Sequence, residues 1–300
     1  MNKMRYTLSV LAAFLFVITC ATAGQASAQR TFVAGPGIGN DSNTASDCSF
    51  SAPCRNFSAA YTVTNTGGEI IALSPGVGYG GLTITHAITV TGLPGQVAFV
   101  AVTASTTGFT VSAGASDLVV VQNITFNGSG AGGSTGLAYT SGSLTIQGCA
   151  FNQLTTGVSI SNTTARVNVK QSRIQSNTTG ILVTGGKVAI EDCFITQNTL
   201  GVRADGDGGS QNTPPNGTTL VYINGGDITL NTTGLQMNSP GLKQGGGNNG
   251  WNIFVRVSNG VPFTNIIANG TALVITGNTS QCGADPCASP AMGTYVGQGF

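Results

Sequence analysis

This chain is poor in charge and in histidine, and each shortage excludes a class of function. Charged residues make up 7% of the 300 residues, against roughly 25% in an average globular protein. The formal net charge is +1 and no basic stripe is present, so a nucleic acid is not an expected partner. No Ser/His/Asp arrangement can be built around the one histidine, His86, and ten acidic residues leave little material for clustered catalytic carboxylates.

Long apolar runs are also missing. Lys3 and Arg5 precede an apolar run at residues 8–19, which is too short to span a bilayer. Residues 26–28 form a small-x-small cleavage site, so residues 1–28 are predicted to be a signal peptide. The mature protein is therefore expected to be secreted or periplasmic/extracellular. No later segment is apolar enough to be a transmembrane helix.

Six cysteines remain after the predicted cleavage, in an oxidising compartment. Cys48 and Cys54 flank one short loop, and Cys282 and Cys287 flank another, so both pairs are expected to form local disulfides. No Cys-x-x-Cys motif or nearby histidine accompanies them, and no metal site is predicted. Lipid modification at Cys20 is an alternative to a mature chain that starts at Gln29.

What the chain does have is glycine, threonine, asparagine and β-branched residues arranged in a repeat. Each repeat holds two apolar-x-apolar strands, one apolar residue between them and a glycine before the second strand. Disorder is not expected from such a composition. Period-2 strands in a repeat of this length predict one coil of a parallel β-helix each. The four clearest repeats are residues 144–160, 167–183, 188–204 and 221–237.

Reading the repeats in register predicts which residues stack from coil to coil. Cys149 and Cys193 share one position with Ser172 between them, so their Cα atoms should lie about 9.6 Å apart, too far for a disulfide. Both are therefore expected to be free, buried thiols. Three apolar columns and one column of stacked asparagine amides are also predicted: Leu137, Val158, Ile181, Val202 and Leu235; Tyr139, Ile160, Val183, Ala204 and Met237; Phe126, Phe151, Ile174, Ile195 and Ile228; and Asn177, Asn198 and Asn231.

The predicted fold is all-β, a right-handed parallel β-helix of about nine coils with an N-terminal cap. The cap is assigned to residues 29–68, with one or two helical turns at 57–61, because the first coil would otherwise expose apolar interior and unpaired strand edges. The β-helix is assigned to residues 69–280 and a C-terminal tail to 281–300.

The capping block and the coils that follow it carry a resemblance. The matching residues are 32–35, 39–43, 52–57, 68–76 and Tyr79. Over nearly all of the mature chain the sequence resembles secreted bacterial right-handed parallel β-helix proteins of the pectate-lyase-like superfamily. That superfamily hosts lyases, hydrolases, adhesins and proteins without known activity, so the resemblance implies the fold and leaves the function open.

The resemblance implies that an enzyme of this superfamily would carry several carboxylates on one face. Aligning the repeats of this chain does not bring such a cluster together. Glu191 shares a column with Lys170, so a coil-to-coil ion pair is expected. Asp192 and Asp227 have no acidic neighbour in their columns. His86 falls at a turn between two strands without an acidic partner and is expected to be a solvated turn residue. No catalytic residue is assigned.

Two insertions, at residues 205–219 and 238–251, leave the same corner of consecutive coils. Solenoids often carry binding loops in this way. One hypothesis is a ligand wall in which Trp251 stacks on a sugar ring while Asp205 and Asp207 offer oxygens to Ca²⁺ or to hydroxyls, with Lys243 in the same loop. The alternative is that the two insertions are glycine-rich surface loops that bind no ligand. No cofactor is expected unless these loops bind Ca²⁺.

One outward column, Thr145, Asn168, Ala189 and Tyr222, is predicted to be flat and uncharged, which suits weak contact with a polymer or a passive surface. The sequence favours a non-catalytic secreted protein that binds carbohydrate or mediates adhesion, with a polysaccharide or cell-surface glycan as partner. A lyase or glycoside hydrolase acting on acidic polysaccharide, and a structural spacer without a ligand, remain alternatives.

Overall fold

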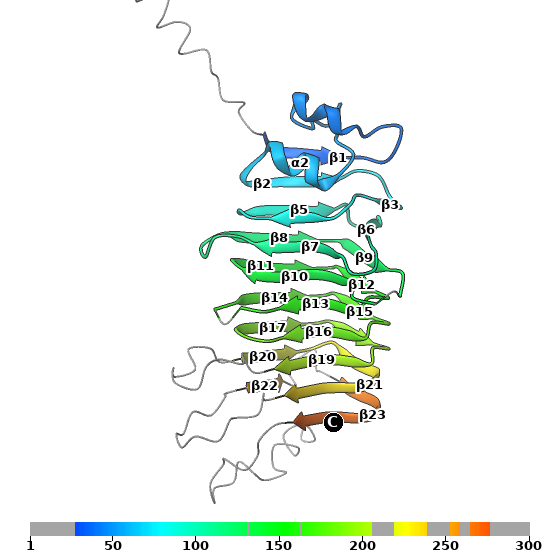
Figure 1. Cartoon of the computed structure of the whole chain (residues 1–300), viewed down its shortest axis with the longest axis vertical. Helices are drawn as coiled ribbons and strands as arrows, with labels where there is room; N and C mark the ends of the chain where they lie inside the picture. Colours follow the sequence, from blue (N-terminus) through cyan, green and yellow to red (C-terminus); the bar gives the residue numbers. More distant parts are fainter. Residues whose placement is uncertain are drawn as a thin grey trace, which may run out of the picture.

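The chain folds into an elongated stack of parallel strands, drawn from blue to orange along its axis in Figure 1. The computed structural model describes residues 28–130, 132–162, 164–205, 219–238, 253–258 and 265–276. The strands pair in parallel with the equivalent strands of the neighbouring coils, which confirms the predicted parallel β-helix. Residues 1–27 of the predicted signal peptide and the whole C-terminal tail lie outside the described residues, whereas Ala28 begins the first strand.

Three rows of strands form the walls of the stack. One row is a nine-stranded sheet, and the other two rows join through the long strand β21 into a fourteen-stranded sheet. The nine-stranded sheet contains, in order, β1 (Ala28–Val33), β2 (Thr64–Ala72), β5 (Ile88–Gly92), β8 (Leu118–Gln122), β11 (Ser143–Gln147), β14 (Arg166–Lys170), β17 (Lys187–Glu191), β20 (Thr219–Asn224) and β22 (Ile253–Ser258).

The fourteen-stranded sheet wraps around the remaining sides. One of its rows contains β3 (Val77–Gly78), β6 (Ala98–Val102), β9 (Ile124–Gly128), β12 (Ala150–Asn152), β15 (Arg173–Gln175) and β18 (Phe194–Thr196). The other contains β4 (Leu82–Ile84), β7 (Thr107–Ser112), β10 (Thr135–Ser141), β13 (Thr156–Ile160), β16 (Thr179–Val183) and β19 (Leu200–Asp205). β21 (Asp227–Asn238) spans both rows and pairs with β23 (Asn265–Thr276).

The interior follows the predicted columns. The register pairs Leu137 with Val158, Val158 with Ile181, and so on to Leu235. The column from Phe126 to Ile228 is also in register, and all five of its side chains are buried. The ring centroids of Phe126 and Phe151 lie 4.8 Å apart in a stacked arrangement. Like residues therefore lie over like, as the alternation of apolar and polar residues predicts.

The row that contains β9, β12, β15 and β18 is called the middle row below. The corner after this row is built from two repeated positions. A non-glycine residue in the left-handed region comes first, at Gln153, Ser176, Gln197 and Leu230, with φ between 55° and 59°. A buried residue follows, and in three coils it is Asn177, Asn198 or Asn231. The left-handed residue reverses the chain in one step, and the buried side chain then fills the corner.

The repeated glycine that follows this corner is required by close approach of the backbone. A Cβ atom added at Gly157 would lie 2.5 Å from the carbonyl oxygen of Gly180, and one added at Gly180 would lie 2.5 Å from that of Gly201. A side chain at this position would push neighbouring coils apart. The glycine column is therefore a packing requirement of the stack.

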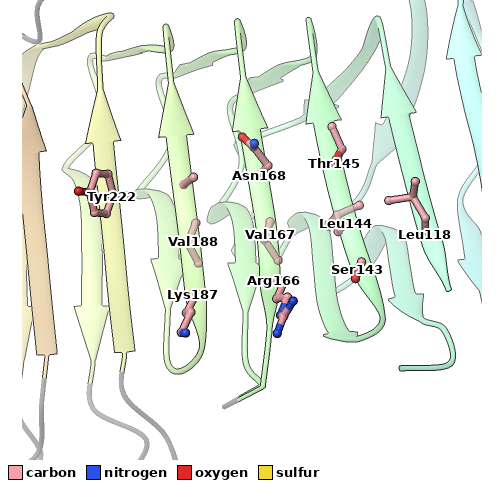
Figure 2. Close-up of a pocket in the computed structure, with 11 residues that line it drawn as sticks. Leu118, Ser143, Leu144, Thr145, Arg166, Val167, Asn168, Lys187, Val188 and Tyr222 are labelled. Carbon is pink, nitrogen blue, oxygen red and sulfur yellow. The ribbon is translucent and has the colours of Figure 1, made fainter. Parts of the chain in front are cut away.

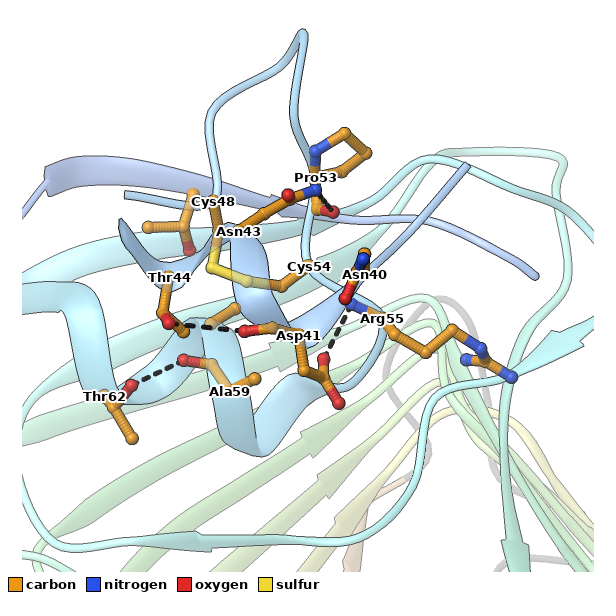
Figure 3. The surroundings of a disulfide bond; sticks show 12 residues. Asn40, Asp41, Asn43, Thr44, Cys48, Pro53, Cys54, Arg55, Ala59 and Thr62 are labelled. Atoms are coloured by element: carbon orange, nitrogen blue, oxygen red, sulfur yellow. Dashed lines mark hydrogen bonds between the residues drawn. A yellow bond between two sulfur atoms is a disulfide. The ribbon is translucent and has the colours of Figure 1, made fainter. Parts of the chain in front are cut away.

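The N-terminal end is covered by a short helical segment, η1 (Asp41–Ser46), and by helix α2 (Phe57–Val63). The side chain of Phe57 is fully buried, and its ring centroid lies 5.1 Å from that of Tyr79. The Asp41 carboxylate accepts hydrogen bonds from the backbone amides of Arg55 and Asn56 at 2.8 and 2.9 Å. The disulfide between Cys48 and Cys54 closes the same loop (Figure 3), as predicted.

Candidate functional site

Only one residue of the predicted ligand wall is described. Asp205 ends β19, and its carboxylate accepts hydrogen bonds from Arg203 Nε at 2.9 and 3.0 Å. This carboxylate is therefore paired with the side chain of an arginine on its own strand. Trp251, Asp207 and Lys243 lie outside the described residues, as do Cys282 and Cys287, so the ligand wall and the second disulfide stay predictions.

The carboxylates within the described residues do not gather into a group that could hold a metal ion. Lys170 Nζ lies 3.3 Å from Glu191 Oε2, which confirms the predicted ion pair between neighbouring coils. No group of three His, Cys, Asp or Glu side chains that could hold a metal ion is present in the part of the chain that the structure describes.

His86 has a different environment from the one predicted. It lies at the bend between β4 and β5, but it is half-buried, and its Nδ1 lies 2.5 Å from the Tyr61 hydroxyl. The Tyr61 oxygen also accepts hydrogen bonds from the backbone amides of Thr85 and His86 at 2.7 and 3.1 Å. His86 thus lies at the predicted turn but is only partly solvated, because Tyr61, which is contributed by α2, contacts this bend.

Cys149 and Cys193 are free and buried, as predicted. Burial raises the pKa of each thiol to about 12. Cys149 Sγ donates to the carbonyl of Gln147 at 3.5 Å, and Cys193 Sγ donates to that of Glu191 at 3.3 Å. A protonated, buried thiol is a poor nucleophile and a poor metal ligand, so these two residues serve packing.

A shallow groove with a volume of about 550 Å³ lies on the outer face of the nine-stranded sheet (Figure 2). It extends over five adjacent strands, from β8 to β20. At a strand spacing of about 4.8 Å, this corresponds to roughly 19 Å along the axis of the stack. The lining residues are Leu118, Ser143, Leu144, Thr145, Arg166, Val167, Asn168, Lys187, Val188, Ala189 and Tyr222.

Side-chain size explains the hollow. Tyr222 is the Cα partner of Ala189, whose methyl group rises little above the sheet. Asn168 and Thr145 continue this column at modest height. The Tyr222 ring, which is 36% exposed, stands at one end, and Leu118, which is 54% exposed, stands at the other. The small side chains beside the Tyr222 ring leave an open trough, and Leu118 closes its far end from the neighbouring column, as the Cα partner of Ser143.

Two cations lie along one side of this groove. Arg166 is the first residue of β14 and Lys187 is the first residue of β17, and the two are Cα partners on adjacent strands. Both side chains are exposed, and Figure 2 shows them at the same level of the sheet. Among the described residues that line the groove there is no carboxylate. The described lining of the groove therefore carries positive charge without a carboxylate to match it.

The sequence-based interpretation missed this groove. It treated Thr145, Asn168, Ala189 and Tyr222 as a flat, uncharged column. The column is uncharged, but it is hollowed, and the next outward column supplies Arg166 and Lys187 along its side. The shared position of these two cations in successive repeats was the available signal.

A second hollow, of about 450 Å³, lies at the corner after the middle row. Its lining is mostly polar and uncharged and includes the left-handed residues Gln153, Ser176 and Gln197. It contains no titratable or aromatic side chain in the part that the structure describes. The groove on the nine-stranded sheet is therefore the stronger candidate site.

Comparison with known proteins adds no assignment, since no protein-family model, curated protein or solved structure matches this chain. Within the described residues, neither helical segment has the length and apolar character needed to cross a bilayer. The disulfide between Cys48 and Cys54 is compatible with an extracellular location.

Proposed function

We propose that this protein is a secreted, non-catalytic β-helix that binds an extended polysaccharide along the outer face of its nine-stranded sheet. The observation that carries the proposal is the groove itself, which is open, crosses five strands and combines an exposed aromatic ring with hydroxyl and amide side chains. Aromatic rings stack on the apolar faces of sugars, while hydroxyl and amide groups match sugar hydroxyls. A regular, uncharged floor suits a repeating ligand.

The groove favours binding over catalysis. Hydrolysis of a glycosidic bond usually needs two carboxyl groups on opposite sides of that bond. Ser143, Thr145, Asn168 and Tyr222 provide hydrogen-bonding groups in the groove, but its described lining includes no carboxyl group. The resemblance to secreted bacterial β-helix proteins and the predicted signal peptide are consistent with an extracellular glycan as partner.

The first test compares binding of the full chain and of two variants to a panel of neutral and acidic polysaccharides by affinity electrophoresis. Tyr222→Ala removes the ring from the groove, and we expect binding to weaken about threefold to tenfold, the size of a stacking contribution. Phe194→Ala is the matched control, because Phe194 is 50% exposed on β18, in another row of strands. Its binding should equal that of the wild type.

Two results would contradict the proposal. Absence of binding to every polysaccharide would favour a structural spacer. Release of unsaturated products or of new reducing ends by the wild-type chain would show an enzyme instead.

A further inference from the structure

We propose that Arg166 and Lys187 form an anion-recognition pair, which makes the ligand of the groove an acidic polysaccharide. This inference rests on the proposed function, because it names the chemical class of the polymer that the same groove binds.

The first argument is the pairing of two other cations, Arg30 and Lys170, on the nine-stranded sheet. Two cations on this sheet have a carboxylate as Cα partner on the next strand. Arg30 Nε lies 2.8 Å from Glu69, and Lys170 Nζ lies 3.3 Å from Glu191. At the other end of the same two strands that carry Lys170 and Glu191, the partners are Arg166 and Lys187.

This like-charge pair is unfavourable for the fold. Like charges directly opposite each other on neighbouring strands destabilise a sheet. The cost is avoidable, since any polar uncharged residue fits an exposed position at the start of a strand. A feature that works against stability at an exposed site is typical of a binding function.

The second argument is geometric. Adjacent strands lie about 4.8 Å apart, so both cations can approach one acidic group, or two acidic groups on consecutive sugar units. The planar guanidinium of Arg166 can hold a carboxylate or a sulfate through two parallel hydrogen bonds, and the ammonium of Lys187 adds a mobile point charge. The two cations lie at the side of the groove, so the anion would lie beside the sugar ring that faces Tyr222.

The surroundings favour a polysaccharide over a nucleic acid as the polyanion. Two cations line the groove in the part of the chain that the structure describes, and the whole chain has a formal net charge of +1. Tight binding of nucleic acid usually neutralises more phosphates than two cations can. Ser143, Thr145 and Asn168 instead provide hydroxyl and amide groups for a ligand that is rich in hydroxyl groups.

The test uses the full chain and three single variants: Arg166→Gln, Lys187→Gln and the control Arg173→Gln. Arg173 matches Arg166 closely, since both are exposed and each is the first residue of its strand, but Arg173 lies on β15, outside the groove. Each variant removes one positive charge, so a difference between them cannot come from net charge. The probes are polygalacturonate, a sulfated galactan, neutral dextran and double-stranded DNA.

We expect Arg166→Gln and Lys187→Gln to weaken binding of at least one acidic polysaccharide about tenfold, with Arg173→Gln unchanged. Added salt should weaken the same binding. Comparing polygalacturonate with the sulfated galactan identifies the anion as carboxylate or sulfate. The melting temperatures of the two groove variants should stay equal to that of the wild type or rise, because like-charge repulsion is relieved.

The outcomes separate the two proposals. Equal affinity for dextran and the acidic polymers, with no effect of either groove variant, would overturn the anion site and leave polysaccharide binding intact. Binding to no polysaccharide would overturn both. Equal dependence of DNA binding on Arg166 would overturn the polysaccharide assignment, and a fall in melting temperature in both groove variants would show that these cations serve the fold.

Discussion

At the scale of single residues, one repeat position shows why cysteine and serine replace each other in this chain. Cys149, Ser172 and Cys193 are all buried, and each donates to the carbonyl two residues before it, which for Ser172 is that of Lys170 at 2.7 Å. In these three coils the position therefore holds a small side chain with one donor, and cysteine and serine both provide it. A donor is not required in every coil, because the register places Gly226 at this position in the next coil. The thiols need no redox or metal role.

The two buried thiols make the free energy of unfolding depend on pH in the alkaline range. Burial raises the pKa of the Cys149 and Cys193 thiols from 9.0 to about 12. Between these values the unfolded chain releases protons that the folded chain retains, so the free energy of unfolding falls as pH rises. We expect a smaller fall in the variant Cys149→Ser/Cys193→Ser, measured by urea denaturation at about pH 8 and about pH 10.5. Equal falls in both proteins would contradict the burial of these thiols.

At the scale of the repeated corner, the asparagine column joins neighbouring coils. Asn198 Oδ1 accepts from the backbone amide and the side-chain amide of Asn177, both at 3.0 Å. Asn198 Nδ2 donates to the carbonyl of Ile174 at 3.0 Å and to Asn231 Oδ1 at 2.9 Å. Asn177 and Asn198 are thus bonded to the coils on both sides, and Asn231 to the coil before it, so these buried amides are satisfied.

Replacing one asparagine of this column should lower the free energy of unfolding by more than the loss of an ordinary hydrogen bond does. Asn198→Ala leaves the buried backbone amide of Asn177 and the carbonyl of Ile174 without these partners. We expect the free energy of unfolding to fall by about 3 kcal/mol, since each unsatisfied buried group costs about 1–3 kcal/mol. Chemical denaturation measures this value. The exposed neighbour Gln197 is the control, and a Gln197→Ala change of the same size would argue against the hydrogen-bond explanation.

At the scale of the whole molecule, the stack behaves as a series of coils in which each coil contacts its neighbours. Stability is then close to a sum of coil terms and interface terms, and the ends need protection. At the N-terminal end, α2 buries Phe57 and Ala60, and the Tyr61 hydroxyl contacts the bend at His86. This segment covers apolar interior that the first coil would otherwise expose.

The disulfide holds the loop that leads into this segment. Reduction of Cys48–Cys54, or the double variant Cys48→Ala/Cys54→Ala, should lower the free energy of unfolding by about 2 kcal/mol, as expected for a loop this short. We also expect concentration-dependent association, because a loosened cap exposes strand edges. Light scattering before and after reduction measures it. The free thiols are unaffected by the reductant, so an unchanged melting temperature and no association would contradict this role.

Much of the architecture could be predicted from the sequence. The pairing of Val167 with Leu144 and with Val188, the column from Phe126 to Ile228 and the ion pair between Lys170 and Glu191 all follow from aligning the repeats. The left-handed corners did not follow, because glutamine, serine and leucine occupy a conformation that their intrinsic preferences disfavour. The contact between Tyr61 and His86 joins a helix to a distant bend, and no local pattern encodes it.

The sequence by itself determined which residues superpose, because a strand alternates its side chains with period two and the repeat length brings equivalent positions into register. Tertiary structure alone decided the depth of the groove. That depth depends on the relative sizes of side chains on five neighbouring strands, with Ala189 low between taller neighbours and Tyr222 and Leu118 at the ends. Such a surface exists only after separate coils have packed side by side.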